Sequence, residues 1–167
     1  MSPGQQTVPI VAAEHFVLAT RDTGYRSVAA AVAELIDNSL QANARHIDVM
    51  VSEFEQAHEP STVVGVLDDG SGMSPATLEC ALQFGGTNRF DDRSGLGRFG
   101  MGLPNSSVSH SRRLDVYSWQ RPSEVYHTYL DVDEDAAGRL RFIPRPRRVS
   151  LPPWVTPSVG RSGTLVL

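Results

Sequence analysis

Two polar side chains one helical turn apart, Glu34 and Asn38, form the first group that could do chemistry. Residues at positions i and i+4 of a helix share one face, so these two side chains would point the same way. A carboxylate there can activate a water molecule, and an amide oxygen beside it can bind a hard cation such as magnesium. The alternative is a solvated polar stripe, and the pair alone does not choose between the two.

A second group follows an apolar stretch and reads LDDGSGM over residues 67–73. An aspartate at a strand end, followed by glycines, can present its carboxylate to a cleft whose floor is bare backbone. Asp68 would then accept a hydrogen bond from an exocyclic amine such as that of adenine, and Met73 would form an apolar wall for a planar base. The same residues also suit an ordinary Asp-Gly turn between strands, with Met73 in the core.

The third group is a glycine run, GLGRFGMGLPNSS over residues 95–107, in which Gly97, Gly100 and Gly102 have the spacing G-x-x-G-x-G. At the start of a helix, free N–H groups and the helix dipole favour anions, and glycines leave room for a phosphate. An irregular stretch precedes the run, where a dinucleotide-binding loop would follow the first strand of a βαβ unit. The run therefore predicts a phosphate cradle of another kind.

The composition limits what such a site can use. All 15 basic residues are arginines, which excludes the phosphate-loop lysine of Walker A ATPases, the strand lysine of protein kinases and Schiff-base chemistry. The single cysteine, Cys80, excludes an internal disulfide, and we expect it to be buried in a helix. Any nucleotide site must then rely on backbone N–H groups, arginine or a metal ion.

The whole-chain properties favour one cytoplasmic domain without a membrane span. The chain has 167 residues, 40% of them apolar, which suffices for one core. No apolar stretch approaches the ~18 residues of a membrane span, and the first residues lack a signal-peptide pattern. The net charge of −4 argues against bulk nucleic-acid binding. The arginines of residues 139–148 could grip nucleic acid, but their prolines and the acidic run at 131–135 favour a solvated loop.

Hydrophobic spacing predicts the elements that position the three groups. Apolar residues recur at helical spacing around the first group, and alternating or continuous apolar runs precede the second. The expected helices cover residues 26–40, 74–82 and a segment that begins at 100–104. The expected strands cover 46–51, 62–67, 114–119, 125–132 and 164–167, the first two forming a hairpin. Residues 85–97 are expected to form a mobile flap.

The ordered motifs E-x-x-D-N, D-x-G-x-G, a glycine-rich flap ending in G-x-x-G-x-G, and G-T before a terminal strand resemble the GHKL superfamily of Bergerat-fold ATPases. This superfamily includes gyrase, the ninety-kilodalton heat-shock chaperones, histidine kinases and the MutL proteins. The resemblance runs from Glu34 to Thr164. It implies an α/β (α+β) two-layer sandwich, in which helices cover one face of a mixed, mostly antiparallel sheet. Residues 1–167 would be one ATP-binding domain, either truncated from a longer protein or standing alone.

The resemblance also implies a role for each matching residue. Glu34 would be the general base, Asn38 a magnesium ligand, and Asp68 the acceptor for the adenine amine. Thr164 would support the Asp68 contact through water, and the flap from Gly85 to Leu96 would be the lid. The implied nucleotide-binding residues are Asp68, Gly70, Gly72, Met73, Thr87, Gly97, Arg98, Phe99, Gly100, Met101, Gly102 and Thr164.

Within the superfamily the motifs resemble the MutL, chaperone and microrchidia (MORC) branch more than the histidine kinases, which generally lack the glutamate. Gln41 departs from that branch, where aspartate is usual. The expected function is a slow ATP- and magnesium-dependent ATPase coupled to lid closure, to an ATP-dependent homodimer, and to a downstream transducer or effector domain or a partner protein. The alternative is a nucleotide-controlled binding module with negligible hydrolysis. The third alternative is a domain that has lost nucleotide binding. The presence of Glu34, Asn38 and Asp68 argues against it.

Overall fold

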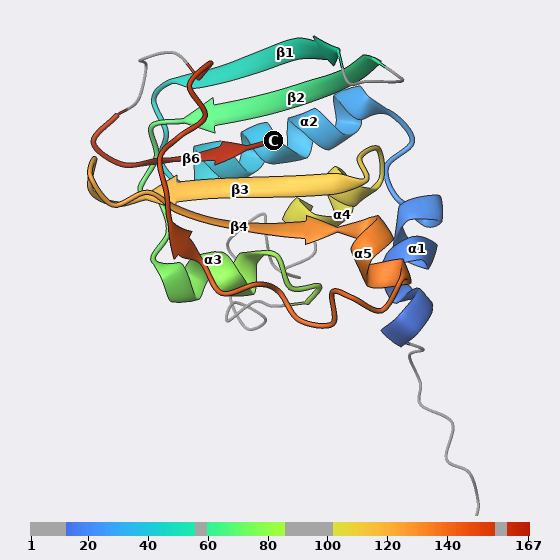
Figure 1. The fold of residues 1–167 in the computed structure, drawn as a ribbon. Coiled ribbons are helices and arrows are strands. Elements are labelled where there is room, and N and C mark those ends of the chain that lie inside the picture. Colours follow the sequence, from blue (N-terminus) through green and yellow to red (C-terminus); the bar gives the residue numbers. More distant parts are fainter. Residues whose placement is uncertain (1–12, 56–59, 86–101, 156–159) are drawn as a thin grey trace, which may run out of the picture.

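A six-stranded antiparallel sheet forms one layer of the fold in the computed structural model, which describes residues 13–55, 60–85, 102–155 and 160–167 (Figure 1). The strand order is β1-β2-β6-β3-β4-β5, and β1 and β2 form the expected hairpin. Every pairing among the described residues is antiparallel, so this part holds no parallel pair of the expected mixed sheet. The strands are β1 Ile47–Glu55, β2 Pro60–Asp68, β3 Arg113–Trp119, β4 Tyr126–Asp131, β5 Arg147–Arg148 and β6 Gly163–Val166.

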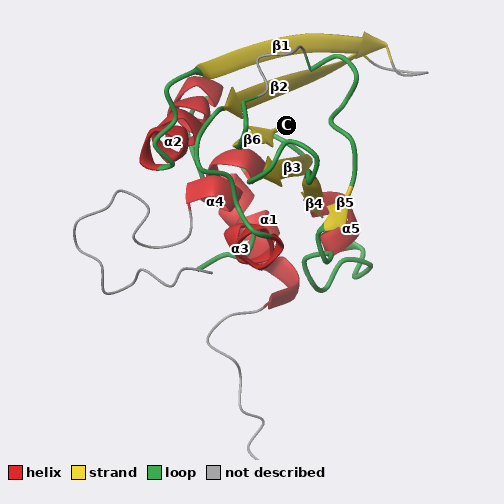
Figure 2. Cartoon of the chain, turned by 90° about the vertical axis from the view of Figure 1, so that its left-hand side faces the viewer, coloured by secondary structure: helices red, strands yellow, loops and turns green. Residues whose placement is uncertain are grey.

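Helices α1 to α4 form the second layer and lie on one side of the sheet (Figure 2). Their buried side chains, including Leu78, Leu82 and Val108, pack against Leu114 and Val116 of β3. This arrangement confirms the predicted two-layer α/β sandwich. No helix in the described residues is long and apolar enough to cross a membrane. The helices are α1 Ala13–Thr23, α2 Val28–Gln41, α3 Pro75–Ala81, α4 Gly102–Val108 and α5 Val132–Ala136.

The other face of the sheet carries a smaller apolar cluster, centred on Trp119 and on Leu165 of β6. The segment that joins β5 to β6 covers this cluster with Leu151 and Val155. The indole N–H of Trp119 donates a hydrogen bond to the carbonyl oxygen of Gly160 at 3.1 Å. The end of β2 and the start of β6 are therefore packed from both faces, which fixes the polar residues there, Asp68 and Thr164.

Helix α2 begins where the sequence supplies a capping residue. Ser27 is its N-cap, and the Ser27 hydroxyl accepts a hydrogen bond from the backbone N–H of Ala30 at 3.2 Å. The apolar residues that follow at helical spacing turn one side of α2 toward the sheet. The adjoining side of α2 carries the polar groups of the first motif and faces the start of α4, where Glu34 lies beside Gly102.

Ser27→Ala should lower the free energy of unfolding by about 1 kcal/mol, because the first turn of α2 loses a partner for one of its free N–H groups. Urea unfolding followed by circular dichroism measures the change. Ser109→Ala is no suitable control, because the Ser109 hydroxyl contacts another segment. Ser27→Asn, which keeps a capping acceptor, should retain the wild-type stability. An alanine variant as stable as the wild type would show that the cap contributes nothing.

Three short elements, α1, α5 and β5, were not expected from the sequence. The predicted strand at residues 125–132 ends one residue early, because the Asp131 carboxylate caps α5 by accepting the N–H groups of Asp133 and Glu134 at 3.0 Å. The prediction that Cys80 is buried is wrong, since its side chain is exposed. Leu78 and Leu82, four residues apart, turn the buried face of α3 inward, and a residue midway between them faces outward.

Candidate functional site

Asp68, the last residue of β2, is buried where β2 lies beside strand β6 and against helix α2, with 7% of its surface exposed. Its Oδ2 accepts a hydrogen bond from the Ser39 hydroxyl at 3.0 Å, and its Oδ1 accepts one from the N–H of Gly70 at 2.9 Å. Burial raises the pKa of Asp68, and the hydrogen bonds from Gly70, Ser39 and the backbone of Thr164 oppose that rise. Since a carboxylate offers about four lone-pair positions, Asp68 retains capacity for a further donor.

The loop after Asp68 is bound to the end of α2. The N–H of Ser71 donates to the carbonyl oxygen of Ala42 at 2.9 Å. Asp69 Oδ1 accepts the N–H groups of Arg45 at 2.6 Å and His46 at 2.9 Å. These bonds, with the His46 side chain, lower the pKa of Asp69 to about 2. The second aspartate of the motif therefore holds the loop in place, while the first faces the interior.

The glycines of this loop are required by the packing of the protein itself. Gly72 has a φ of +63°, and a Cβ there would overlap the carbonyl oxygen of Trp119. A Cβ at Gly70 would lie 2.8 Å from the Cβ of Ala42. Room for a nucleotide base, the predicted reason for these glycines, stays a prediction. Their identity is already explained by the fold.

Thr164 lies opposite Asp68 in the register of β2 and β6. Its hydroxyl is 3.0 Å from the Ser118 hydroxyl, which donates to the carbonyl oxygen of Gly163 at 3.0 Å. The Ser118 hydroxyl also accepts the N–H of Met73 at 2.8 Å, while the half-buried Met73 side chain packs against the main core. Ser118 thus joins the terminal strand to the residue after the D-x-G-x-G motif.

Glu34 is a residue of α2, and its side chain faces α4 and the turn before α2. Its Oε2 accepts a hydrogen bond from the Tyr25 hydroxyl at 3.1 Å. A Cβ built at Gly102 would overlap its Oε1, so the last glycine of the run leaves space for this carboxylate. The sequence predicted that glycine for contact with phosphate. The structure shows that Glu34 occupies the space beside it.

Asn38 follows Glu34 by one turn of α2 and precedes Ser39, the partner of Asp68. Its Nδ2 is buried and has no hydrogen-bond partner among the described residues. An amide N–H group that has no partner in this part of the chain can donate to a ligand oxygen. The first motif therefore contacts the second through Ser39 and the third through Glu34.

Sequence reasoning missed Tyr25, Ser39 and Ser118. Ser118 carries a local signal, because it is a polar residue on the inward face of β3 between apolar neighbours. Tyr25 carries none, since its N–H bonds to the distant Ser109 and its hydroxyl partner, Glu34, lies nine residues further along without a recognisable spacing pattern. Six predicted nucleotide-binding residues lie outside the described residues, and the structure adds nothing about them: Thr87, Gly97, Arg98, Phe99, Gly100 and Met101.

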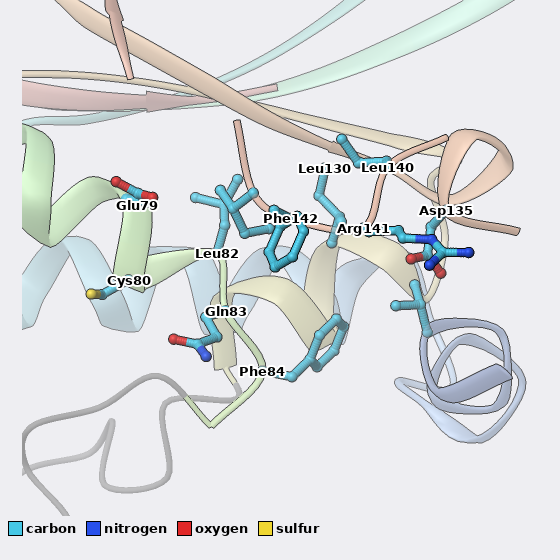
Figure 3. A pocket seen from close by; sticks show the side chains of 12 residues that line it. Glu79, Cys80, Leu82, Gln83, Phe84, Leu130, Asp135, Leu140, Arg141 and Phe142 are labelled. Carbon is cyan, nitrogen blue, oxygen red and sulfur yellow. The ribbon is translucent and has the colours of Figure 1, made fainter. Parts of the chain in front are cut away.

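Two cavities lie apart from this group of residues. One, of about 370 Å³, lies between the end of α3 and residues 140–143, and Leu82 and Phe142 face each other within it (Figure 3). The other, of about 910 Å³, lies between α2 and the first half of β2 and includes Val32 and Val63 in its lining. Neither is lined by Glu34, Asn38 or Asp68.

Comparison with known proteins places these motifs in one family. Residues 25–148 match the profile of the histidine kinase-, DNA gyrase B- and HSP90-like ATPases. The chain is 28% identical over 125 residues to human ATPase MORC2, covering 70% of this chain and 12% of that protein. It is 34% identical over 116 residues to the DNA mismatch repair protein MutL of Paramagnetospirillum magneticum, covering 66% of this chain and 18% of that protein.

A solved structure, the N-terminal domain of a DNA repair protein, shares the fold. Its TM-score is 0.56 at 18% sequence identity, and the match covers 90% of this chain and 38% of that one. This chain spans less than a fifth of the length of MORC2 and less than a fifth of the length of MutL. The profile match covers most of this chain, and the similarity to MORC2 and MutL agrees with the branch predicted from the motifs. The chain therefore belongs to the histidine kinase-, DNA gyrase B- and HSP90-like ATPases, the GHKL superfamily.

Proposed function

We propose that this chain is an ATP-binding, magnesium-dependent ATPase domain in which Asp68 recognises adenine and Glu34 activates the attacking water. One observation carries the proposal. The buried Asp68 carboxylate is bonded through Ser39 to the helix that presents Glu34 and Asn38. A group that can bind a base and a group that can deprotonate water are therefore joined through the hydrogen bond between α2 and the end of β2.

At the adenine end, Asp68 would accept a hydrogen bond from the exocyclic amine of the base. Burial favours this use, because a charged acceptor in a dry site forms a stronger hydrogen bond than one in water. Thr164 would support the contact through water, since its hydroxyl lies opposite Asp68 and is held by Ser118. Met73, fixed at its backbone N–H, would contact the face of the base.

At the phosphate end, the residues fit a magnesium ion that is held mainly by phosphate and water oxygens. The described residues contain no group of three or more His, Cys, Asp or Glu side chains that could hold a metal. Magnesium commonly keeps several waters and takes few protein ligands, so the amide oxygen of Asn38 would suffice. The ion would supply positive charge at the phosphate oxygens. Glu34 would accept the proton of the attacking water, and the glycine run would donate N–H groups to the phosphates.

Titration calorimetry with a non-hydrolysable ATP analogue tests this assignment. The wild type should bind the analogue more tightly in magnesium than in chelator, and Asn38→Ala should reduce that difference by about tenfold, since one oxygen ligand is lost. Asn43→Gly, at an exposed asparagine after the same helix whose φ of 59° glycine also accepts, is the matched control. Equal wild-type affinity with and without magnesium would refute the role of Asn38. Absence of binding would refute the whole proposal.

A phosphate-release assay separates the ATPase from the alternative, a nucleotide-controlled binding module with negligible hydrolysis. Slow release that requires magnesium supports the ATPase, and tight binding without release supports the module. Lid closure over residues 85–96, an ATP-dependent homodimer, a downstream effector region and a cytoplasmic location remain predictions. So does contact of the phosphates with Gly97 and Gly100, which lie outside the described residues.

A further inference from the structure

We propose that Tyr25 is a positioning residue, whose hydroxyl holds the Glu34 carboxylate in the orientation needed to activate water. The inference rests on the proposed function of Glu34 and adds a residue to it. Glu34 has a long side chain with three rotatable bonds, and a general base must lie within hydrogen-bond reach of the proton it removes. A base on such a side chain works best when its neighbours lock its rotamer.

Both ends of Tyr25 are anchored. Its backbone N–H donates to the hydroxyl of Ser109, the residue after α4, at 3.0 Å. The Ser109 hydroxyl in turn donates to the carbonyl oxygen of Asn105 at 2.5 Å. A Cβ built at Gly24 would overlap the Ser109 hydroxyl, so the turn before α2 lies directly against α4. The backbone of Tyr25 is therefore held against α4, and its hydroxyl at the other end of the side chain is bonded to Glu34.

The hydroxyl acts as a donor to a charged acceptor. Burial raises the pKa of Tyr25, and the nearby Glu34 carboxylate raises it further, so the hydroxyl stays protonated at neutral pH. A hydrogen bond to an ionised carboxylate is shorter and stronger than one between neutral groups. This bond uses one lone pair of Oε2 and leaves others free to accept a proton.

Gly102 restricts the same carboxylate from a second direction. Oε1 of Glu34 lies in the space that a side chain at position 102 would fill. The carboxylate therefore has a neighbour at each oxygen, with Tyr25 on Oε2 and the start of α4 beside Oε1. The three segments together select one orientation of Glu34.

Tyr25→Phe tests the inference, because it removes the hydroxyl and keeps the ring. Its kcat should fall about tenfold, a fraction of the ~10²–10⁴ that a general base contributes, while its affinity for a non-hydrolysable ATP analogue stays at the wild-type value. Tyr129→Phe is the matched control. Tyr129 lies on β4, away from the site, and its hydroxyl donates to Glu134 Oε2 of α5 at 3.2 Å. Removing this hydroxyl should change neither kcat nor the affinity for the analogue.

A second measurement needs no nucleotide. Urea unfolding of wild type, Tyr25→Phe, Glu34→Ala and the double variant forms a cycle, in which loss of the hydroxyl should have no further effect once Glu34 is gone. Strictly additive effects would show that the two side chains do not interact, and the inference would fall.

The kinetic outcomes are equally decisive. A Tyr25→Phe kcat within twofold of an active wild type overturns the inference and leaves the proposed function intact. A parallel loss of kcat and analogue affinity also overturns it, because Tyr25 would then hold the nucleotide or the fold. A wild type that binds ATP without turnover contradicts the proposed function itself and removes both roles.

Discussion

Glu34→Ala should bind ATP with the wild-type affinity and hydrolyse it ~10²–10⁴-fold more slowly, because a general base contributes a factor of that size to the rate. The carboxylate faces Tyr25 and the start of α4, and among the described residues it has no hydrogen bond to Asp68, Ser39 or Thr164 that would couple it to the adenine end. Calorimetry and a phosphate-release assay on the same preparation measure binding and turnover separately. Because bound ATP would not be hydrolysed, the variant should also remain in the conformation that ATP binding stabilises.

Glu53→Ala, at an exposed glutamate of β1, is the matched control and should retain both binding and turnover. Circular dichroism must show that Glu34→Ala is folded. If Glu34→Ala loses affinity for ATP along with its turnover, the carboxylate holds the nucleotide and is not a base. If its turnover is unchanged, another group activates the water.

Asp68→Asn should weaken ATP binding by about 5- to 150-fold, which corresponds to about 1–3 kcal/mol for a buried hydrogen bond left unmade. The amide oxygen will take the place of Oδ1, since that position accepts the N–H of Gly70. The amide nitrogen must then replace Oδ2, and it would present a donor where the adenine amine needs an acceptor. Calorimetry with ATP and GTP measures the effect, and the preference for ATP should fall with the affinity. Unchanged affinity for ATP would show that Asp68 does not recognise the base.

The fold should tolerate this variant, which keeps the binding result interpretable. The Ser39 hydroxyl can accept the new amide N–H and still donate to the carbonyl oxygen of Leu35, 3.1 Å away. A raised pKa means that the folded state holds the Asp68 proton more tightly than the unfolded state. The contribution of Asp68 to stability is therefore present at low pH and is lost as pH rises through that pKa. Asparagine has no such loss, so Asp68→Asn should be at least as stable as the wild type at neutral pH.

The parts of the fold that follow from periodicity were predictable from the sequence. The spacing around Val32 and Leu35 predicted α2, and two apolar runs predicted the hairpin of β1 and β2 to within a few residues. Helix α1, the five-residue α5 and the two-residue β5 were not predicted. Their local patterns are weak, and packing against distant segments determines them.

The candidate site was predictable as a set of motifs but not as a network. The motifs identified Glu34, Asn38 and Asp68, and the structure brings their elements together, although their roles remain predictions. Tyr25 could not be found in the same way, because the hydrogen bond of its N–H to Ser109, 84 positions away, leaves no local pattern. Gly102 was identified for its spacing, and the structure places the Glu34 carboxylate in the space that a side chain there would fill.

The crowding of Glu34 against Gly102 constrains how related sequences can diverge. A larger residue at position 102 would push the Glu34 carboxylate out of the position in which it meets Tyr25, so the two positions should not vary independently. In a lineage that keeps the glutamate in this orientation, selection for activity would also preserve the glycine, because its lack of a side chain leaves room for the carboxylate. Relatives that have lost the carboxylate should carry residues larger than glycine at position 102, so a glycine there would indicate that hydrolysis has been retained.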